Sequence, residues 1–214
     1  KKELSKTNNL LGICYGAIGM PDSALYFYNV SFDYVKILGD SETMSYLFSN
    51  IGNVYRKSGN YTKALDLYLK SVKICETIGH RSGLTSSFNN IGLVYDDMGN
   101  FDVALDYYKK SLDIATELND SDGIARAYSN IAIVYNEKGN AEISLEYDLK
   151  SLAIDRAMGD KASEAISLVN IGVYFYDKGD MRTAQKYYND AYDIKIKLND
   201  KKGIANLLCN LSLV

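Results

Sequence analysis

The chain has 214 residues, of which 47% are hydrophobic and 24% are charged, a balance typical of a water-soluble protein with a packed core. Its formal net charge of −3 argues against nucleic-acid binding, which normally needs Lys and Arg gathered on one face. The apolar runs are too short to cross a bilayer, so the sequence predicts no membrane span.

An internal repeat of 40 residues, without insertions, runs through the whole chain. Closely related strings begin at Asn9, Ser49, Asn89, Ser129 and Val169, and the start of a sixth, CNLSLV, closes the sequence. A fixed period of this length is the signature of a repeat architecture. We therefore predict a single repeat array with units at about 1–39, 40–79, 80–119, 120–159 and 160–199, and a partial unit at 200–214.

Each unit predicts two helices, as the second unit illustrates. Apolar residues recur every three or four positions from Ser41 to Lys57 and again from about Tyr61 to Ile78, which indicates two helices with one buried face each. Between them, Gly59 can adopt the left-handed conformation that ends a helix, and Asn60 can cap the next one. The whole chain predicts about eleven helices and no strands.

The boundaries between units hold residues that end one helix and begin another. The first boundary position holds the two residue types that most readily adopt positive φ, at Gly39, Gly79, Asn119, Gly159 and Asn199. The next position holds four good N-caps and one exception, at Asp40, His80, Asp120, Asp160 and Asp200. Pro21 lies where the first unit begins its second helix, and the first helical turn tolerates proline.

Small and aromatic residues recur at fixed positions inside the helices. The first helix of each unit repeats a small residue at Gly12, Gly52, Gly92, Ala132, Gly172 and Ser212, and the second helix repeats another at Ala24, Ala64, Ala104, Ser144 and Ala184. Glycine inside a helix costs about 0.5–1 kcal/mol relative to alanine, so we expect the two backbones to approach closely there. Rings at Tyr28, Tyr68, Tyr108 and Tyr188 are expected to fill gaps between helices.

This pattern resembles the tetratricopeptide repeat. The residues that carry the resemblance in the second unit are Phe48, Ile51, Gly52, Tyr55, Ala64, Tyr68 and Ser71. The units exceed the standard length of about 34 residues and lack its proline. In this they are similar to the arrays of kinesin light chains, Partner of Inscuteable, bacterial Rap regulators and bacterial sensor histidine kinases. The resemblance implies an all-α, right-handed solenoid in which the first helix of each unit, called helix A below, lines a concave surface.

Helix A repeats an asparagine that packing does not require, at Asn50, Asn90, Asn130, Asn170 and Asn210. An asparagine amide both donates and accepts, so a ladder of them could grip an extended peptide. In the tetratricopeptide family, helix-A asparagines are known for this role, and the resemblance assigns it to these five. The alternative is that each amide bonds to the backbone of the neighbouring unit and stabilises the array.

Affinity and specificity must then come from variable neighbours, because five bonds of about 1 kcal/mol each barely offset the 4–15 kcal/mol cost of association. The predicted wall is basic at Arg56 and Lys57, apolar at Leu93, Ile133, Val169 and Val173, and acidic at Asp97, Glu137 and Asp177. Asn53, Asn89 and Arg126 complete the predicted site. A mixed-charge peptide with an apolar middle is the predicted ligand.

The sequence shows no pattern for catalysis, a cofactor or a metal. The single histidine, His80, replaces a capping aspartate, so we expect a surface role for it. Phosphate-binding loops, paired metal-ligand motifs and serine elbows are all missing. Cys14, Cys75 and Cys209 lie at different positions of the repeat, which predicts buried, reduced thiols rather than disulfides or a metal site.

The leading hypothesis is a non-enzymatic peptide- or protein-binding scaffold. The chain begins without Met and stops inside a repeat, so we expect a fragment of a larger, cytoplasmic protein, and the resemblance implies the sensory or interaction region of a bacterial signalling protein. One alternative is self-assembly into a homo-oligomer through the ends, where Ile204, Leu207, Leu208 and Leu211 would need covering. Another is a regulatory array for an attached kinase, phosphatase or transcription-factor domain.

Overall fold

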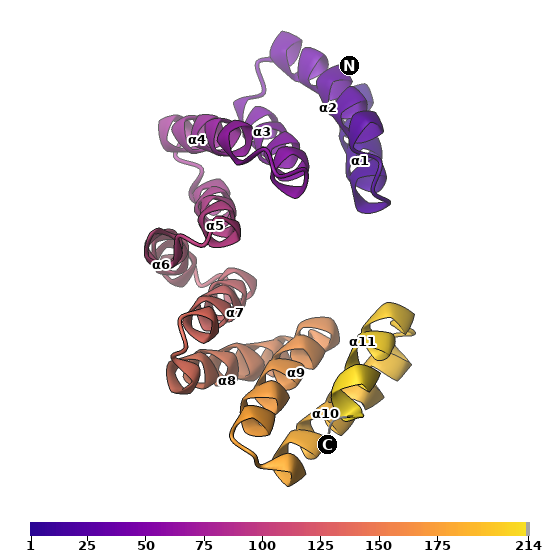
Figure 1. Cartoon of the computed structure of the whole chain (residues 1–214). Coiled ribbons are helices and arrows are strands. Elements are labelled where there is room, and N and C mark those ends of the chain that lie inside the picture. The colour runs from indigo at the N-terminus through magenta and orange to yellow at the C-terminus, as the bar shows by residue number, and fades with distance from the viewer. Residues whose placement is uncertain (213–214) are drawn as a thin grey trace. The chain divides into compact units, whose positions relative to one another are not determined.

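The computed structural model describes residues 1–212, which form eleven α-helices joined by short turns (Figure 1). The helices in chain order are α1 (Lys2–Ala17), α2 (Pro21–Leu38), α3 (Ser41–Lys57), α4 (Tyr61–Ile78), α5 (Arg81–Asp97), α6 (Phe101–Glu117), α7 (Ser121–Glu137), α8 (Ala141–Met158), α9 (Lys161–Asp177), α10 (Met181–Lys197) and α11 (Lys201–Leu211). The prediction of an all-α fold is confirmed, and the bounds expected in the second unit coincide with α3 and α4. The last two positions of the predicted partial unit, 213–214, lie outside the described residues.

Each odd-numbered helix packs against the even-numbered helix that follows it, so the repeat is a helical hairpin. The hairpins fall into two compact units. The first unit, Lys1–Leu118, contains the hairpins α1–α2, α3–α4 and α5–α6, and the second, Asn119–Val214, contains α7–α8, α9–α10 and the helix α11. Within the units, α2 packs on α3, α4 on α5, α8 on α9 and α10 on α11. The odd-numbered helices are therefore the predicted helices A.

The residues at the unit boundaries behave as predicted. The φ angles are positive at all five expected positions, 65°, 68° and 73° at Gly39, Gly79 and Gly159, and 53° and 54° at Asn119 and Asn199. Each of the four boundary aspartates caps the following helix by accepting a backbone N–H bond, at Asp40, Asp120, Asp160 and Asp200. These local signals mark the boundaries between repeats, which explains why the bounds could be read from the sequence.

Asp160 makes the most cap bonds, and its removal is expected to weaken the fold. Its Oδ1 accepts from the backbone N–H groups of Ala162 and Ser163 at 3.0 and 3.1 Å, and its Oδ2 accepts from the Ser163 hydroxyl at 2.8 Å. Asp160→Ala should lower the free energy of unfolding by about 1–2 kcal/mol in urea denaturation at neutral pH. Asn140→Ala is the matched control, because Asn140 precedes α8 without a side-chain cap bond.

The effect of Asp160→Ala should also depend on pH. The backbone N–H of Ser163, and then its hydroxyl, hold the pKa of Asp160 below its usual range. A group whose pKa is lowered in the folded state contributes stability above its unfolded value and loses it as the pH falls through the folded pKa. The loss should therefore be complete at neutral pH and shrink below about pH 4. A loss of equal size on both sides of that pH would contradict the assignment.

The repeated glycine of helix A makes room for an aromatic ring. A Cβ atom at Gly12, Gly52, Gly92 or Gly172 would lie 2.5–2.6 Å from the tyrosine ring of the same hairpin, at Tyr28, Tyr68, Tyr108 and Tyr188 respectively. These four residues are at most 4% exposed, so the prediction that the rings fill gaps between helices is confirmed. The expected close approach of two backbones is wrong, because the ring of the second helix takes that space.

Buried serines add a polar link to four of the hairpins that the apolar pattern did not predict. Each serine hydroxyl donates to a backbone carbonyl of helix A in the same hairpin, with distances of 2.8, 2.9, 2.9 and 3.1 Å for Ser31, Ser71, Ser111 and Ser151. Because the bond joins a side chain to a helix carbonyl that already accepts one backbone bond, it stabilises the hairpin without disrupting helix A.

Candidate functional site

The five repeated asparagines lie on α3, α5, α7, α9 and α11, and all five are half-buried. Two of them bond to a side chain of the preceding hairpin. The amide nitrogen of Asn50 donates to Oδ1 of Asn9 at 3.1 Å, and that of Asn170 donates to Oδ1 of Asp148 at 3.2 Å. These two amides therefore link consecutive hairpins, through side chains rather than through the backbone expected in the alternative reading. Each still has a carbonyl oxygen with which to accept a bond.

In the first compact unit, Lys1–Leu118, three predicted site residues meet in one pocket of about 500 Å³. It lies between α1, α2 and α3, and its wall includes Asn50, Asn53 and Lys57. The side chain of Asn53 is fixed by a hydrogen bond, because its Oδ1 accepts a bond from the hydroxyl of Tyr68 at 2.7 Å. The pocket is thus a preformed hollow with one lysine and two amides.

In the second compact unit, Asn119–Val214, three pockets lie along α7, α9 and α11. The first, of about 250 Å³, is lined by Arg126, Asn130 and Ile133 among others, and the second, of about 230 Å³, by Ile133, Asn170 and Val173. The third, of about 190 Å³, is lined by Val169, Asn170 and Asn210. Each pocket in this series therefore contains at least one repeated asparagine.

The other predicted site residues line none of these four pockets. Asn89 is buried, Asn90 and Leu93 are half-buried, and Asp97, Glu137 and Asp177 are exposed. Arg56 of α3 and Asp97 of α5 form an ion pair with an N–O distance of 2.7 Å. Two groups predicted as basic and acidic parts of the wall therefore neutralise each other, which leaves Lys57 as the basic group of the first pocket.

Two buried carboxylates on α8 were not predicted. Asp148 is 4% exposed and lines the 230 Å³ pocket, and Asp155 is 1% exposed and lines the 250 Å³ pocket. Burial raises the pKa of Asp148 to about 6, although the bond from Asn170 acts in the opposite direction. Burial likewise raises the pKa of Asp155, whose Oδ2 accepts from the hydroxyl of Ser167 at 3.1 Å. The signal was present in the sequence, because position 148 is the one at which a unit lacks its tyrosine.

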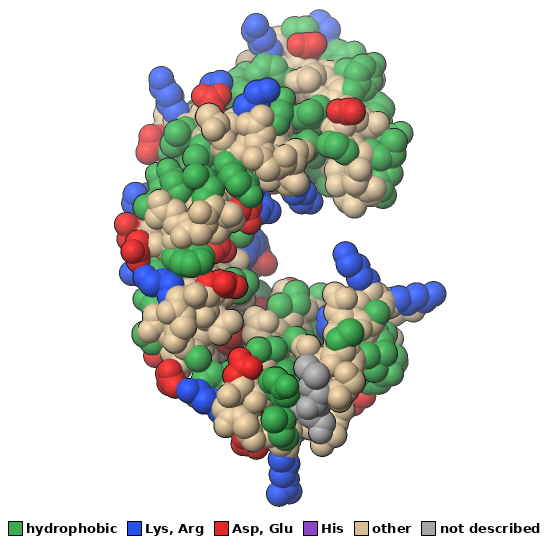
Figure 2. Space-filling view, in the orientation of Figure 1, with side chains coloured by type: hydrophobic (Ala, Val, Ile, Leu, Met, Phe, Trp, Pro, Cys, Tyr) green, Lys and Arg blue, Asp and Glu red, His purple; other side chains and the backbone are tan. Residues whose placement is uncertain are grey.

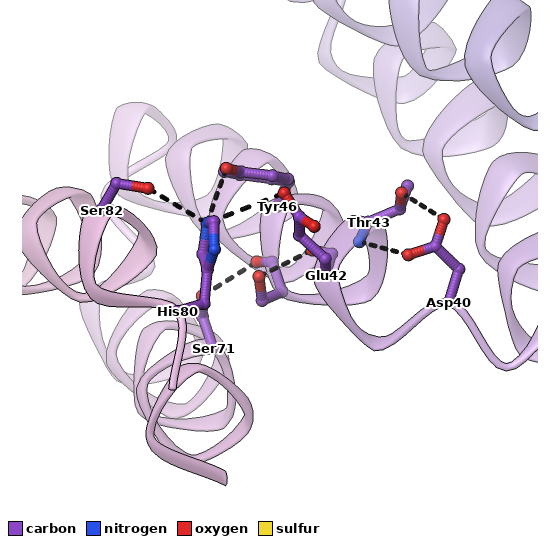
Figure 3. A network of polar contacts seen from close by, with 8 residues as sticks. Asp40, Glu42, Thr43, Tyr46, Ser71, His80 and Ser82 are labelled. Atoms are coloured by element: carbon purple, nitrogen blue, oxygen red, sulfur yellow. Dashed lines mark hydrogen bonds and ion pairs between the residues drawn. The ribbon is translucent and has the colours of Figure 1, made fainter. Parts of the chain in front are cut away.

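His80 joins two helices A instead of standing free on the surface (Figure 3). Its Nε2 lies 2.7 Å from the hydroxyl of Tyr46 on α3, 3.3 Å from the hydroxyl of Ser82, and 4.0 Å from a carboxylate oxygen of Glu42. The side chain makes no cap bond to α5 and is 19% exposed. His80 is therefore a half-buried bridge between consecutive hairpins, which corrects the expected surface role.

Residues 1–212 contain no group of three or more His, Cys, Asp or Glu side chains that could hold a metal ion. In the same range, none of the helices combines the length and the apolar character that crossing a membrane requires. Acidic and basic side chains are interspersed on the face drawn in Figure 2. Cys75 is buried, whereas Cys14 and Cys209 are exposed, so the expectation of buried thiols is wrong for two of the three.

Comparison with known families agrees with this architecture. The model of the tetratricopeptide repeat family matches residues 43–117 and 123–197, which is one segment in each compact unit. No curated protein sequence matches the chain.

Several solved structures share the fold. One is a Signal Transduction ATPase with Numerous Domains with a tetratricopeptide repeat sensor from Pyrococcus horikoshii, with a TM-score of 0.82, 19% identity and coverage of 97% of this chain and 32% of that one. Another is a Rap protein complexed with competence and sporulation factor, with a TM-score of 0.85, 13% identity and coverage of 95% of this chain and 57% of that one. A kinesin light chain array from Podosopora anserina has a TM-score of 0.68 and 15% identity, with coverage of 92% of this chain and 96% of that one. The chain thus spans about a third of the first protein and just over half of the second.

Proposed function

The chain belongs to the tetratricopeptide repeat family, and we propose that it is a binding scaffold that holds an extended segment of a partner protein along its helices A. The observation that supports this best is the series of pockets between consecutive helices A, each lined by a repeated asparagine. An extended chain presents a backbone donor and acceptor at every residue, and an asparagine amide can pair with either.

The asparagines differ in what they can offer a partner. Asn90 and Asn210 make no side-chain hydrogen bond to any residue within 1–212, so both ends of their amides can pair with a peptide. Asn50 and Asn170 donate inside the protein, so they offer their carbonyl oxygens to a peptide N–H. The stabilising role and the binding role are therefore compatible within each compact unit, since Asn50 and Asn90 lie in the first and Asn170 and Asn210 in the second.

The proposal is tested by alanine substitution of the two unpaired amides. Peptides of random extended sequence are selected for binding to the chain, and the tightest is measured by calorimetry against the double variant Asn90→Ala/Asn210→Ala. The double variant removes the unpaired amide of whichever compact unit holds the peptide, and loss of the two bonds of that amide, worth about 1 kcal/mol each, should weaken binding about 10–30-fold. Asn100→Ala is the control, because Asn100 is exposed and its side chain makes no hydrogen bond at the N-cap position of α6. Unchanged affinity in the double variant, or failure to select any peptide, would overturn the proposal.

We propose further that the binding serves signalling. Fold likeness to a sensor region of a signal-transduction ATPase and to a Rap protein in complex with competence and sporulation factor supports this proposal. The pockets named above supply a binding surface for such a role.

Self-assembly is a second candidate, although the expected surface for it changes. Of the four residues predicted to need covering on α11, Leu207 is buried, Ile204 and Leu211 are half-buried, and only Leu208 is exposed. At the opposite end, Leu4, Leu10 and Ile13 of α1 are 51%, 60% and 44% exposed, so α1 also offers an apolar surface. Light scattering over a range of concentrations distinguishes the candidates, because assembly through α1 would raise the mass without any peptide.

A further inference from the structure

The hairpin α7–α8 departs from the repeat at three positions, two of which, the glycine and the tyrosine, contact each other in the other hairpins. Asp148 stands where the others have a buried tyrosine, Ala132 where they have the glycine that the ring covers, and Ser144 where they have alanine. The Ser144 hydroxyl donates to the carbonyl of Ala132 at 2.8 Å. The ring and its glycine have been exchanged together, so this hairpin is built around a carboxylate in place of a phenol.

The exchange places that carboxylate in the wall of the 230 Å³ pocket. The wall consists of Ile133, Asn136, Ala141, Ser144, Asp148, Asn170, Val173 and Tyr174. The equivalent pocket of the first unit has Tyr28 at the position of Asp148. A volume of about 230 Å³ is several times the roughly 30 Å³ share of one water molecule, so the pocket has room for a side chain.

The carboxylate of Asp148 lacks a positive partner. Among residues 1–212, its one hydrogen bond comes from the neutral amide of Asn170, although an ionised carboxylate has about four acceptor sites. No Lys, Arg or His lines the pocket. Lys178, whose Nζ lies 5.5 Å from the centre of the Tyr174 ring, is already paired with Glu142 at 2.5 Å. A buried charge without a counter-charge costs free energy, and a bound cation would remove that cost.

We propose that this pocket, called the Asp148 pocket below, receives a lysine or arginine side chain of the partner segment, an inference that rests on the proposed function. The cationic head would donate to Asp148, and the carbonyl oxygen of Asn170 and the hydroxyl oxygen of Ser144 can accept its remaining N–H groups. The apolar stem would lie against Ile133, Val173 and Tyr174, which suits a long side chain with a charged end.

The first experiment uses amino-acid derivatives and does not depend on a peptide partner. Nα-acetyl-lysine methylamide is titrated into the isotopically labelled chain, and Nα-acetyl-norleucine methylamide, which has a similar stem without the charge, is the control. We expect saturable NMR shifts at Asp148, Asn170 and Val173 with lysine only. Asp148→Asn should weaken the binding at least about tenfold, since bonds to charged groups are worth about 1.5–3 kcal/mol. Equal shifts with norleucine, or unchanged binding to Asp148→Asn, would overturn the inference.

A second variant guards against an indirect effect of Asp148→Asn on folding. The double substitution Ala132→Gly/Asp148→Tyr transplants the glycine and ring of the other hairpins, so the helix content should be retained while the pocket loses its carboxylate. Lysine binding should vanish in this variant too. Lysine binding that survives the transplant would place the cation elsewhere and overturn the inference.

Peptide selection separates the failure of this inference from the failure of the proposed function. Peptides selected on the wild-type chain should carry Lys or Arg at one fixed position and should bind Asp148→Asn at least about tenfold more weakly. Selected peptides that lack the cation and bind both proteins equally would overturn the inference and leave the proposed function intact. If Nα-acetyl-lysine methylamide binds but no peptide is selected, the pocket is a small-amine site and the partner-segment proposal fails.

Discussion

Replacement of Gly92 by alanine is expected to lower the free energy of unfolding by about 2 kcal/mol. A Cβ atom at this position would lie 2.5 Å from Cε1 of Tyr108, and that tyrosine is completely buried. Overpacking of a core costs about 1–3 kcal/mol, and a ring with no free space around it belongs at the upper end of this range. The higher helix propensity of alanine returns about 1 kcal/mol. Urea denaturation monitored by circular dichroism measures the difference.

The ring is the cause only if its removal reverses the effect. In the background Tyr108→Leu, which lacks the ring, Gly92→Ala should become neutral or stabilising by up to about 1 kcal/mol, since only the propensity difference remains. The coupling between the two positions should then reach about 2–3 kcal/mol, which is typical of residues in direct contact. Additive effects of the two substitutions would mean that the glycine serves another purpose.

Helix bounds and repeat length could be predicted because they depend on local signals. A left-handed glycine or asparagine and a capping aspartate act on the residues next to them, whatever the rest of the chain does. The role of Gly92 could not be predicted in the same way. A glycine inside a helix announces a close contact, but the contacting group is a ring 16 positions later in the sequence, and nothing in the glycine itself distinguishes a ring from a backbone.

The candidate site was only partly predictable for the same reason. The pattern located the helix faces that carry Asn50, Asn170 and their neighbours, because one period fixes one face. It did not predict that Arg56 would pair with Asp97, because the periodicity within one helix carries no information about a residue 41 positions away on another helix. The period describes only what the units share, so it did not predict the buried carboxylate at position 148.

Asp148 also carries the other large predicted effect: Asp148→Asn should stabilise the chain by about 3 kcal/mol at neutral pH. Burial raises the pKa of this carboxyl from 3.8 to about 6. At neutral pH the group is ionised in the folded protein, and keeping the charge buried costs stability. The folded state binds more protons than the unfolded state between these two values, and wild-type stability therefore falls as the pH rises from about 4 to about 6. The size of the cost follows from 1.36 kcal/mol for each tenfold difference in proton affinity. Asparagine keeps the shape and carries no charge.

Urea denaturation of both proteins between about pH 4 and about pH 7 tests this sign and size. The two stabilities should coincide near pH 4, where Asp148 is protonated when folded, and diverge as the pH rises. Asn170→Ala is a second informative variant, because it removes the donor that lowers the pKa of Asp148. The free energy of unfolding of this variant should depend on pH more steeply than that of the wild type. If Asp148→Asn were less stable than the wild type at neutral pH, the carboxylate would have to be satisfied inside the folded chain, and the same result would leave the Asp148 pocket without its demand for a cation.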